Sequence, residues 1–294
     1  MERSFYLLDV FAEGHYSGNQ LAVFRNAAAI REEDMRRLAR EVHFSETAFI
    51  LSDETRDGGY DVRVFTPAEE VPFSGHAVLG AAYVLQKELV EEPLSTMTVN
   101  LEAGPVDVNF TYRHGDVDAV WVSHMRPEFG SAVGRDRIAS VLGLAPSDID
   151  DTSPVQEALA GLPFVMVPLR SLAAVRRACV VPEEYASLVR TSKSRAVYVF
   201  STETYNPDND FNVRMFADYY GIAEDPATGA GAFCLAAYAL QHLRTESPSL
   251  DLRIEQGYEI RRPSILFARA RREGDHSRVS VGGRVVMVAH GHFV

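Results

Sequence analysis

The stretch Tyr60-Asp-Val-Arg-Val-Phe65 in the first half of the chain returns in the second half as Phe211-Asn-Val-Arg-Met-Phe216. Both stretches are rich in β-branched and aromatic residues, which predicts a strand in each half. A helical pattern follows each strand and is also repeated, as Ala81-Ala-Tyr-Val-Leu-Gln86 and Ala236-Ala-Tyr-Ala-Leu-Gln241. Similar elements in the same order predict two duplicated halves. The alternative is that two buried strand-and-helix pairs acquired similar residues by chance.

The repeated strand and helix are separated by a longer segment in the second half. Val62 and Ala81 are 19 positions apart, whereas the matching residues of the second half are 23 apart. We attribute this difference to the connecting loop. We place the first half at residues 1–126, with residues 280–294 returning to it, and the second half at residues 127–279. Because duplicated halves hold equivalent loops opposite one another, we expect an active-site cleft between them.

Strand and helix patterns alternate along the rest of the chain. Further strands are expected near residues 5–11, 22–24, 47–51, 96–99, 106–110, 120–122, 164–168, 196–200, 252–255, 264–271 and 278–288. Helices are expected at residues 32–41, 76–88, 135–142, 182–191 and 231–243. This mixture predicts an α+β protein rather than a helical bundle.

Composition and charge exclude several classes of protein. With 294 residues, 46% of them hydrophobic and 24% charged, the chain has a globular profile and a length typical of roughly two domains. Its net charge of −12 repels phosphate backbones and anionic membranes, so we expect no nucleic acid or membrane partner. Cys179 and Cys234 are too far apart in sequence to suggest a disulfide framework and fit a reducing compartment. The chain starts without a leader pattern, and its longest apolar block, residues 232–240, is too short to span a bilayer, so we expect a cytoplasmic protein.

Two loops, one in each half, connect the repeated strand to the repeated helix. They are Thr66-Pro-Ala-Glu-Glu-Val-Pro-Phe-Ser-Gly-His76 and Gly221-Ile-Ala-Glu-Asp-Pro-Ala-Thr-Gly229. Ser74 and Thr228 occupy the N-cap positions of the helices that follow. Helix starts with glycine in the first turn expose N–H groups that attract carboxylates, so we expect a small anionic substrate. The alternative is that the two hydroxyls only cap helices and the glycines only make turns.

Glu46 is a candidate for acid/base chemistry. The strand period places it on one face with Phe44, Ala48 and Ile50. A carboxylate among apolar side chains is desolvated, which raises its pKa toward the range of a general acid/base at neutral pH. The alternative is that Glu46 points to solvent at the start of the strand.

His76 and Asp225 join this candidate set because one lies in each of the two loops. Taken singly, each has a simpler interpretation, as a structural histidine and a turn-forming aspartate. Other motifs are weak: Gly229-Ala-Gly lacks the third glycine of a dinucleotide fingerprint, and His290 and His292 lack a third metal ligand. The sequence contains no phosphate-binding loop, zinc-protease motif or serine-hydrolase motif.

The sequence resembles the phenazine-biosynthesis PhzF family, whose fold is that of diaminopimelate epimerase. The resemblance covers essentially the whole chain, and the motifs occur in the family's order. In the first half they are Leu8-Asp-Val-Phe11, Ser17-Gly-Asn19, Leu21-Ala-Val-Phe24, Ser45-Glu-Thr-Ala-Phe49, Val71-Pro-Phe-Ser-Gly-His76 and Leu79-Gly-Ala-Ala82. In the second half they are Glu224-Asp-Pro-Ala-Thr-Gly229, Leu235-Ala-Ala-Tyr238, Gln256-Gly257 and Arg262-Pro-Ser264.

This resemblance implies two pseudo-symmetric domains, each with a barrel-like sheet around a central helix, and a homodimer. It also implies that the enzyme uses no metal, nucleotide or pyridoxal cofactor. Glu46 matches the family's acid/base, and His76 and Asp225 match the residues that support it. We expect further substrate-binding groups at the helix starts and the neighbouring motifs, namely Asn19, Ser45, Ser74, Gly75, Thr228, Gly229 and Ala230.

The implied reaction is the isomerisation of trans-2,3-dihydro-3-hydroxyanthranilate in phenazine biosynthesis. Glu46 would remove the proton at C3 and return it at C1, after which the enol becomes a ketone. The related epimerases and racemases use two cysteines, at positions that hold Ser74 and Thr228 here. Hydroxyls are too weakly acidic to replace those thiols, so two-thiol racemisation is disfavoured.

The chain departs from the family pattern at three positions. Ala230 stands where the family commonly has serine, and Gln20 and Ala77 stand where proline is usual. The missing hydroxyl at residue 230 weakens the assignment of this particular substrate and leaves proton-transfer isomerisation intact. Two alternatives stay open: an epimerase or racemase of another small amino or hydroxy acid, and a non-catalytic binding protein on the same fold.

Overall fold

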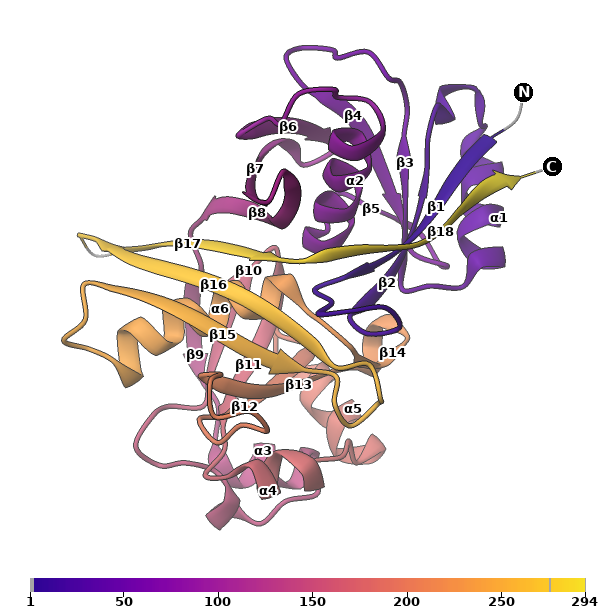
Figure 1. The fold of residues 1–294 in the computed structure, drawn as a ribbon. Helices are drawn as coiled ribbons and strands as arrows, with labels where there is room; N and C mark the ends of the chain where they lie inside the picture. The colour runs from indigo at the N-terminus through magenta and orange to yellow at the C-terminus, as the bar shows by residue number, and fades with distance from the viewer. Residues whose placement is uncertain (1–2, 275, 294) are drawn as a thin grey trace. The chain divides into compact units, whose positions relative to one another are not determined.

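The computed structural model describes residues 3–274 and 276–293. The chain forms two compact units, one of Met1–Ser123 with Gly282–Val294 and the other of His124–Val281. The last strand of the chain therefore belongs to the first unit, where Figure 1 shows it in yellow beside the indigo N-terminal strand. Met1 and Glu2, which open the stretch without a leader pattern, lie outside the described residues.

The first unit is built on one mixed sheet. Its strands are ordered β18–β1–β2–β3–β4–β6–β7–β8, and the short β5 also pairs with β4. The β2–β3 and β4–β6 pairs are parallel, whereas the other pairs are antiparallel. The strands are β1 (Arg3–Val10), β2 (Asn19–Phe24), β3 (Glu46–Ile50), β4 (Tyr60–Phe65), β5 (Glu70–Val71), β6 (Thr96–Leu101), β7 (Gly104–Arg113), β8 (Asp116–Met125) and β18 (Val285–Phe293).

Helix α2 (Gly75–Glu88) forms the centre of this unit and lies against β1, β2 and β3. Ten of its 14 residues are buried, because its first three turns are apolar around the whole circumference. Gly80 permits the close approach of helix and sheet, since a Cβ there would lie 2.3 Å from Leu21 Cδ2. The helix is therefore packed closely against the surrounding strands.

Helix α1 (Glu32–Val42) packs against β3 and β4. Its buried residues, Met35 and Ala39, join a cluster that includes Phe24 of β2. Because side chains alternate along a strand, Phe24 and Leu21 point to opposite faces of the sheet. The two helices thus cover the two faces of the same strands.

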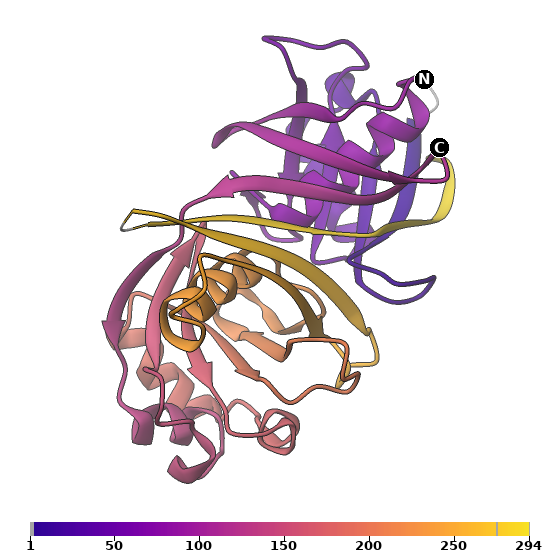
Figure 2. The same cartoon turned by 60° about the vertical axis from the view of Figure 1, so that its left-hand side comes forward.

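The second unit repeats this pairing order. Its sheet runs β9–β10–β11–β12–β13–β15–β16, with β11–β12 and β13–β15 parallel and β14 paired to β13. Helix α6 (Gly229–Tyr238) corresponds to α2, packs against β10, β11, β15 and β16, and has nine of its ten residues buried. Figure 2 shows α6 in orange among the strands of its unit.

The strands of this unit are β9 (Glu128–Ala132), β10 (Gln156–Ala160), β11 (Leu162–Pro168), β12 (Ala196–Ser201), β13 (Phe211–Ala217), β14 (Ile222–Asp225), β15 (Ser249–Gln256), β16 (Ser264–Glu273) and β17 (His276–Gly283), the last of which ends in the first unit. The other helices are α3 (Arg135–Val141), α4 (Leu172–Arg177) and α5 (Pro182–Thr191). Short 3-10 turns lie at Ala27–Ala29, Pro146–Asp148 and Asp218–Tyr220, and a π-helical turn lies at Ala239–Leu243. No helix in the described ranges is long and apolar enough to cross a membrane.

The predicted α+β fold with a buried helix in each similar unit is confirmed. The strand expected at residues 278–288 is instead two strands, β17 and β18, which separate at Arg284. The helix expected at residues 231–243 changes at Tyr238 into the π-helical turn. The sequence patterns miss β5, β9, β10 and β14, which are short and lack a long apolar run.

We expect the extra length of the second half to lie entirely in the connecting loop. The positions of the two N-caps show that only part of it does. Three of the four added residues precede the cap position Thr228, in the segment that contains the turn Asp218–Tyr220. The fourth arises because Thr228 and Ala236 are eight positions apart, whereas Ser74 and Ala81 are seven apart.

Candidate active site

Glu46 is the first residue of β3 and pairs with Leu21 of the parallel strand β2. Helix α1 ends just before it, where His43 at φ 58° adopts the left-handed conformation and turns the chain toward the strand. The carboxylate therefore lies at the end of the sheet rather than in its middle. Its side chain is 19% exposed.

The predicted alternation of β3 is only partly right. Ala48 and Ile50 are buried as expected, but Thr47 and Phe49 on the other face are buried as well. Phe44 packs with the cluster that contains Phe49, not with Ala48, because it precedes the strand and does not follow the strand's period. The burial of Glu46 thus comes from a strand that is covered on both faces.

Ser74 and His76 bring a hydroxyl and an imidazole to the Glu46 carboxylate. Ser74 Oγ donates to Glu46 Oε2, and His76 Nδ1 lies 3.2 Å from the same oxygen. Ser74 Oγ and His76 Nδ1 are 3.5 Å apart. Ser74 is also the N-cap of α2 and accepts from Ala77 N at 3.4 Å, so this predicted cap is confirmed. One buried helix start therefore carries two side chains that meet the same carboxylate.

The electrostatics of this cluster favour proton transfer near neutral pH. Burial raises the pKa of Glu46 to about 7, while the hydrogen bond from Ser74 acts in the opposite direction. A carboxyl group with such a pKa can both accept and release a proton at pH 7. Because part of its side chain is exposed, the group can meet a small molecule.

The start of α6 in the second unit carries another carboxylate. Asp225 ends β14, and Thr228 Oγ1 donates to Asp225 Oδ2 at 2.5 Å. Thr228 occupies the N-cap position but makes no capping bond through its side chain, contrary to the prediction. The reason is that its hydroxyl is engaged by Asp225 and by Gln256, whose Nε2 donates to Oγ1 at 2.9 Å.

Strand register shows that the carboxylates of the two units are not equivalent. Glu46 begins β3, and the residue at the same place in β12 is Ala196. Asp225 lies three residues before its cap hydroxyl, a place that Val71 occupies in the first loop. His76 and Asp225 therefore lie in equivalent loops but at different positions. Each unit has a hydroxyl residue at the start of its buried helix. The neighbouring carboxylate comes from β3 in the first unit and from β14 in the second.

The other residues predicted to bind substrate lie beside these two clusters. Ser45 Oγ donates to Asn19 Oδ1 at 3.2 Å, next to Glu46 in the chain. Gly75 and Gly229 are the first residues of α2 and α6, and Ala230 follows Gly229. Their roles in binding stay predictions.

Sequence reasoning gave no role to Gln256, which the structure connects to the Asp225 and Thr228 cluster. The available signal was an amide that follows Leu252 and Ile254 at the strand period, directly before Gly257. That pattern indicates a buried polar group, but it does not identify the partners.

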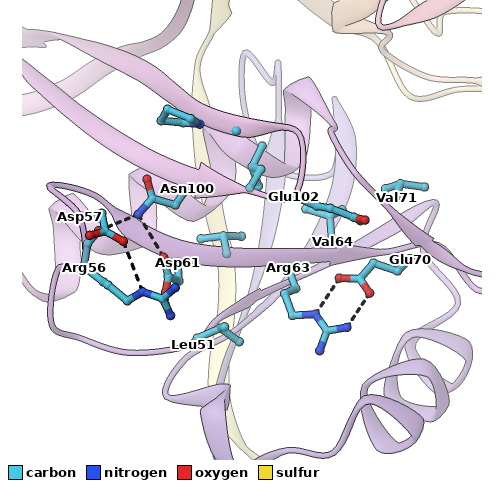
Figure 3. A pocket seen from close by; sticks show the side chains of 14 residues that line it. Leu51, Arg56, Asp57, Asp61, Arg63, Val64, Glu70, Val71, Asn100 and Glu102 are labelled. Carbon is cyan, nitrogen blue, oxygen red and sulfur yellow. Dashed lines mark hydrogen bonds and ion pairs between the residues drawn. The ribbon is translucent and has the colours of Figure 1, made fainter.

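A pocket of about 600 Å³ lies elsewhere in the first unit, between β4 and the β6–β7 turn. Neither Glu46, Ser74 nor His76 lines it. Its two arginines are already engaged by carboxylates, as Figure 3 shows for Arg63 and Glu70. We therefore do not assign the chemistry to this pocket. Within residues 3–274 and 276–293, no three His, Cys, Asp or Glu side chains are grouped to hold a metal ion.

Comparisons with known proteins agree with this fold. The trans-2,3-dihydro-3-hydroxyanthranilate isomerase of Pseudomonas chlororaphis is 32% identical over 292 residues, which cover 99% of each chain. An uncharacterized isomerase of Mesorhizobium japonicum is 31% identical over 98% of each chain. The structure of a PhzF-family phenazine biosynthesis protein from Bacillus anthracis matches with a TM-score of 0.91 at 24% identity, over 100% of both chains. A probable proline racemase from Agrobacterium radiobacter matches with a TM-score of 0.66 at 12% identity, over 99% of this chain and 93% of the other.

The relatives of 31% and 32% identity identify the chain as an isomerase, and its two similar units have an epimerase-like fold. The family model of the phenazine biosynthesis-like proteins, PhzC-PhzF, matches residues 8–291. The chain belongs to this family.

Proposed function

We propose that this isomerase acts on trans-2,3-dihydro-3-hydroxyanthranilate, with Glu46 as the group that moves the proton. The observation that carries the proposal is the partly buried Glu46 carboxyl, which adjoins Ser74 and His76 and whose pKa of about 7 suits a group that must take and return a proton. The 32% identical relative from Pseudomonas chlororaphis bears the name of this reaction, which supports the substrate.

In the proposed reaction Glu46 takes the proton from C3 of the substrate ring. The electron pair left at C3 shifts along the conjugated system, and the proton is returned at C1, so the substrate and the enol product have the same composition. The enol then tautomerises to a ketone. Ser74 donates to the carboxylate and His76 adjoins the same oxygen, so both hold its orientation during the transfer.

The substrate carboxylate has a suitable binding partner in the helix starts. The first N–H groups of a helix have no partner within the helix, so we assign those of Gly75, Gly229 and Ala230 as donors to an anion, and the helix dipole favours negative charge there. We assign His76 and Asp225 to positioning or polarising the substrate. Asp225→Asn is therefore expected to lower turnover.

Proton NMR of the substrate in D2O, with wild type and with Glu46→Gln, tests the proposal. We expect the C3 proton signal to disappear and ketone or condensed products to appear with the wild type alone. An unchanged substrate with the wild type would overturn the substrate assignment. Turnover by Glu46→Gln at the wild-type rate would overturn the role of Glu46.

A second candidate is an epimerase of another small amino or hydroxy acid. The observation that favours it is that each unit has its own carboxylate–hydroxyl pair at a helix start, Glu46 with Ser74 and Asp225 with Thr228. Epimerisation uses one group to remove a proton and another to return it on the opposite face. Deuterium entering a stereocentre without migration of a double bond would select this candidate.

The homodimer implied by the family resemblance stays a prediction. Sedimentation velocity tests it directly, because a monomer has a mass of 32.6 kDa. A species of twice this mass is expected, and a single species at the monomer mass would contradict the prediction.

A further inference from the structure

Gln256 is a fully buried amide at the end of β15 that binds the loop leading into α6. Its Nε2 donates to the Asp225 carbonyl oxygen at 2.8 Å and to Thr228 Oγ1 at 2.9 Å. Its Oε1 accepts from the Thr228 backbone N–H at 3.0 Å. One side chain thus makes three hydrogen bonds to two residues of the candidate site.

These bonds have a defined direction. The Asp225 carbonyl can only accept and the Thr228 N–H can only donate, so the Gln256 amide has one orientation. Its NH₂ group must then donate to Thr228 Oγ1. The Thr228 hydroxyl oxygen thus accepts a hydrogen bond from Gln256. Its single proton is then donated to Asp225 Oδ2, which is 2.5 Å away. Gln256 therefore determines which way the Thr228 hydroxyl points.

The local backbone holds Gln256 firmly against this loop. Gln256 is in parallel register with Val213 of β13. The next residue, Gly257, has φ +78°, and a Cβ there would lie 2.6 Å from the Pro226 carbonyl oxygen. Only glycine permits so close an approach, so the loop and the strand end are fitted to one another.

The residue before Gln256 anchors a second loop. The fully buried Glu255 carboxylate accepts from Tyr205 N at 2.8 Å, Asn206 N at 2.7 Å and Asn209 Nδ2 at 2.7 Å. With its neighbour immobilised in this way, Gln256 has little freedom to leave its place. The end of β15 is a rigid support for the Asp225 and Thr228 cluster.

We propose that Gln256 is a positioning residue of the isomerase. Gln256 keeps the Thr228 hydroxyl donating its hydrogen bond to Asp225. This bond holds the Asp225 carboxylate in one orientation toward the substrate. The inference rests on the proposed function, in which Asp225 positions or polarises the substrate. Gln256 itself needs no contact with the substrate to act in this way.

Four variants test the connection between the two side chains. Gln256→Leu removes all three bonds, Thr228→Val removes the hydroxyl alone, the double variant removes both, and Thr228→Ser keeps a hydroxyl. We expect Gln256→Leu and Thr228→Val each to lower kcat by about 10²-fold with little change in KM, because a small misplacement of a positioned group costs this much. The double variant should lose no more than either single variant, and Thr228→Ser, which keeps the hydroxyl, should lose less of kcat than Thr228→Val.

Gln86→Leu is the matched control. Gln86 is also a buried amide that fixes a loop, since it donates to the Glu92 carbonyl and accepts from Leu94 N, both at 3.1 Å. It lies near the end of α2, ten residues after His76, and these two bonds join it to the loop that follows the helix. We expect this variant to lose stability and to keep the wild-type kcat. If Gln256→Leu fails to fold, Gln256→Glu takes its place, because it keeps the acceptor and loses both donors.

A substrate-free readout separates this inference from the proposed function. Proton NMR should show a slowly exchanging hydroxyl resonance that Thr228→Val abolishes. We expect Gln256→Leu to abolish it as well and Gln86→Leu to retain it. The positioning role would be overturned if the hydroxyl resonance persisted in Gln256→Leu. It would also be overturned if the fold-losses of kcat in the two single variants multiplied in the double variant. A wild type that leaves the substrate unchanged would overturn only the proposed function, and the hydroxyl resonance would still decide the role of Gln256.

Discussion

The guanidinium of Arg63 forms a two-bond fork with the Glu70 carboxylate, with Nε 2.6 Å from Oε1 and Nη2 2.5 Å from Oε2 (Figure 3). Arg214 and Glu224 form the same fork in the second unit, at 2.9 and 2.7 Å. Each fork joins the repeated strand to the short strand that leads into a buried helix. The glutamates lie four residues before Ser74 and Thr228. The repeated arginine of the two similar stretches thus secures the two helix starts.

The two forks should differ in their contribution to stability. Arg214 is 10% exposed and its Nη1 also donates to the carbonyls of Val175 and Ala178, whereas Arg63 is 29% exposed. We expect Arg214→Lys, which keeps the charge but loses the two-bond geometry and the donors to the buried carbonyls, to lower the free energy of unfolding by about 3 kcal/mol, and Arg63→Lys by about 1 kcal/mol. Urea unfolding measures both. Equal losses would contradict the difference in burial.

Glu46 makes stability depend on pH in a defined direction. Burial raises its pKa from 4.5 to about 7, so the folded protein retains a proton that the unfolded chain releases in this range. The stabilisation is complete below about pH 4.5 and is lost as the pH rises through about 7. With the exposed part of the side chain taken into account, the loss should be about 2 to 3 kcal/mol.

Glu46→Gln remains neutral and should not show this loss. Relative to the wild type, the variant should gain about 2 to 3 kcal/mol of unfolding free energy between pH 4 and pH 8. Urea unfolding of both proteins at several pH values within this range provides the measurement. If the unfolding free energies of the two proteins differ by the same amount at every pH, folding does not raise the pKa of Glu46.

The same ionisation should control the rate. Because ionised Glu46 is the proton acceptor, kcat/KM should rise about tenfold per pH unit at low pH and level off above about pH 7. Ser74→Ala removes the hydrogen bond that favours the carboxylate, so the midpoint should move to higher pH. Initial rates with the substrate identified by NMR check both expectations.

Ser171→Ala is the control for the lost cap. Ser171 caps α4 by accepting from Ala174 N at 3.2 Å, in the second unit. Each alanine variant should lose about 1 kcal/mol of stability. Only Ser74→Ala should shift the midpoint, and an equal shift in both variants would assign the effect to general destabilisation.

Helix α6 should tolerate no side chain at Gly231. A Cβ there would lie 2.3 Å from Cε2 of the fully buried Tyr198 ring. We expect Gly231→Ala to lower the free energy of unfolding by about 1 to 3 kcal/mol through overpacking. Gly14→Ala, where no heavy atom lies within 4 Å of the new Cβ, should change it by less than about 0.5 kcal/mol. Thermal unfolding of both variants tests this, and similar shifts would refute the steric explanation.

Local patterns predicted much of the fold and part of the candidate site. The repeated strand, the buried helix behind it and the cap at Ser74 follow from residue types within a few positions of one another. The burial of Glu46 was predicted because strand alternation places it on the same face as apolar residues. In the structure both faces of this strand are covered. Thr228 was predicted as a cap from its position, but its hydroxyl bonds to other groups.

The sequence by itself determined the order of the elements, the duplication and the residue types at both helix starts, because strand and helix periods and capping preferences are local properties. Only the tertiary structure decided that Ser74 and His76 meet Glu46 and that Gln256 directs the Thr228 hydroxyl to Asp225. The contacts with Glu46 and with Gln256 join residues about 30 positions apart, such as Gln256 and Asp225 at 31. The direction of a hydrogen bond depends on which donors and acceptors packing brings within reach, and a linear pattern carries no information about that choice.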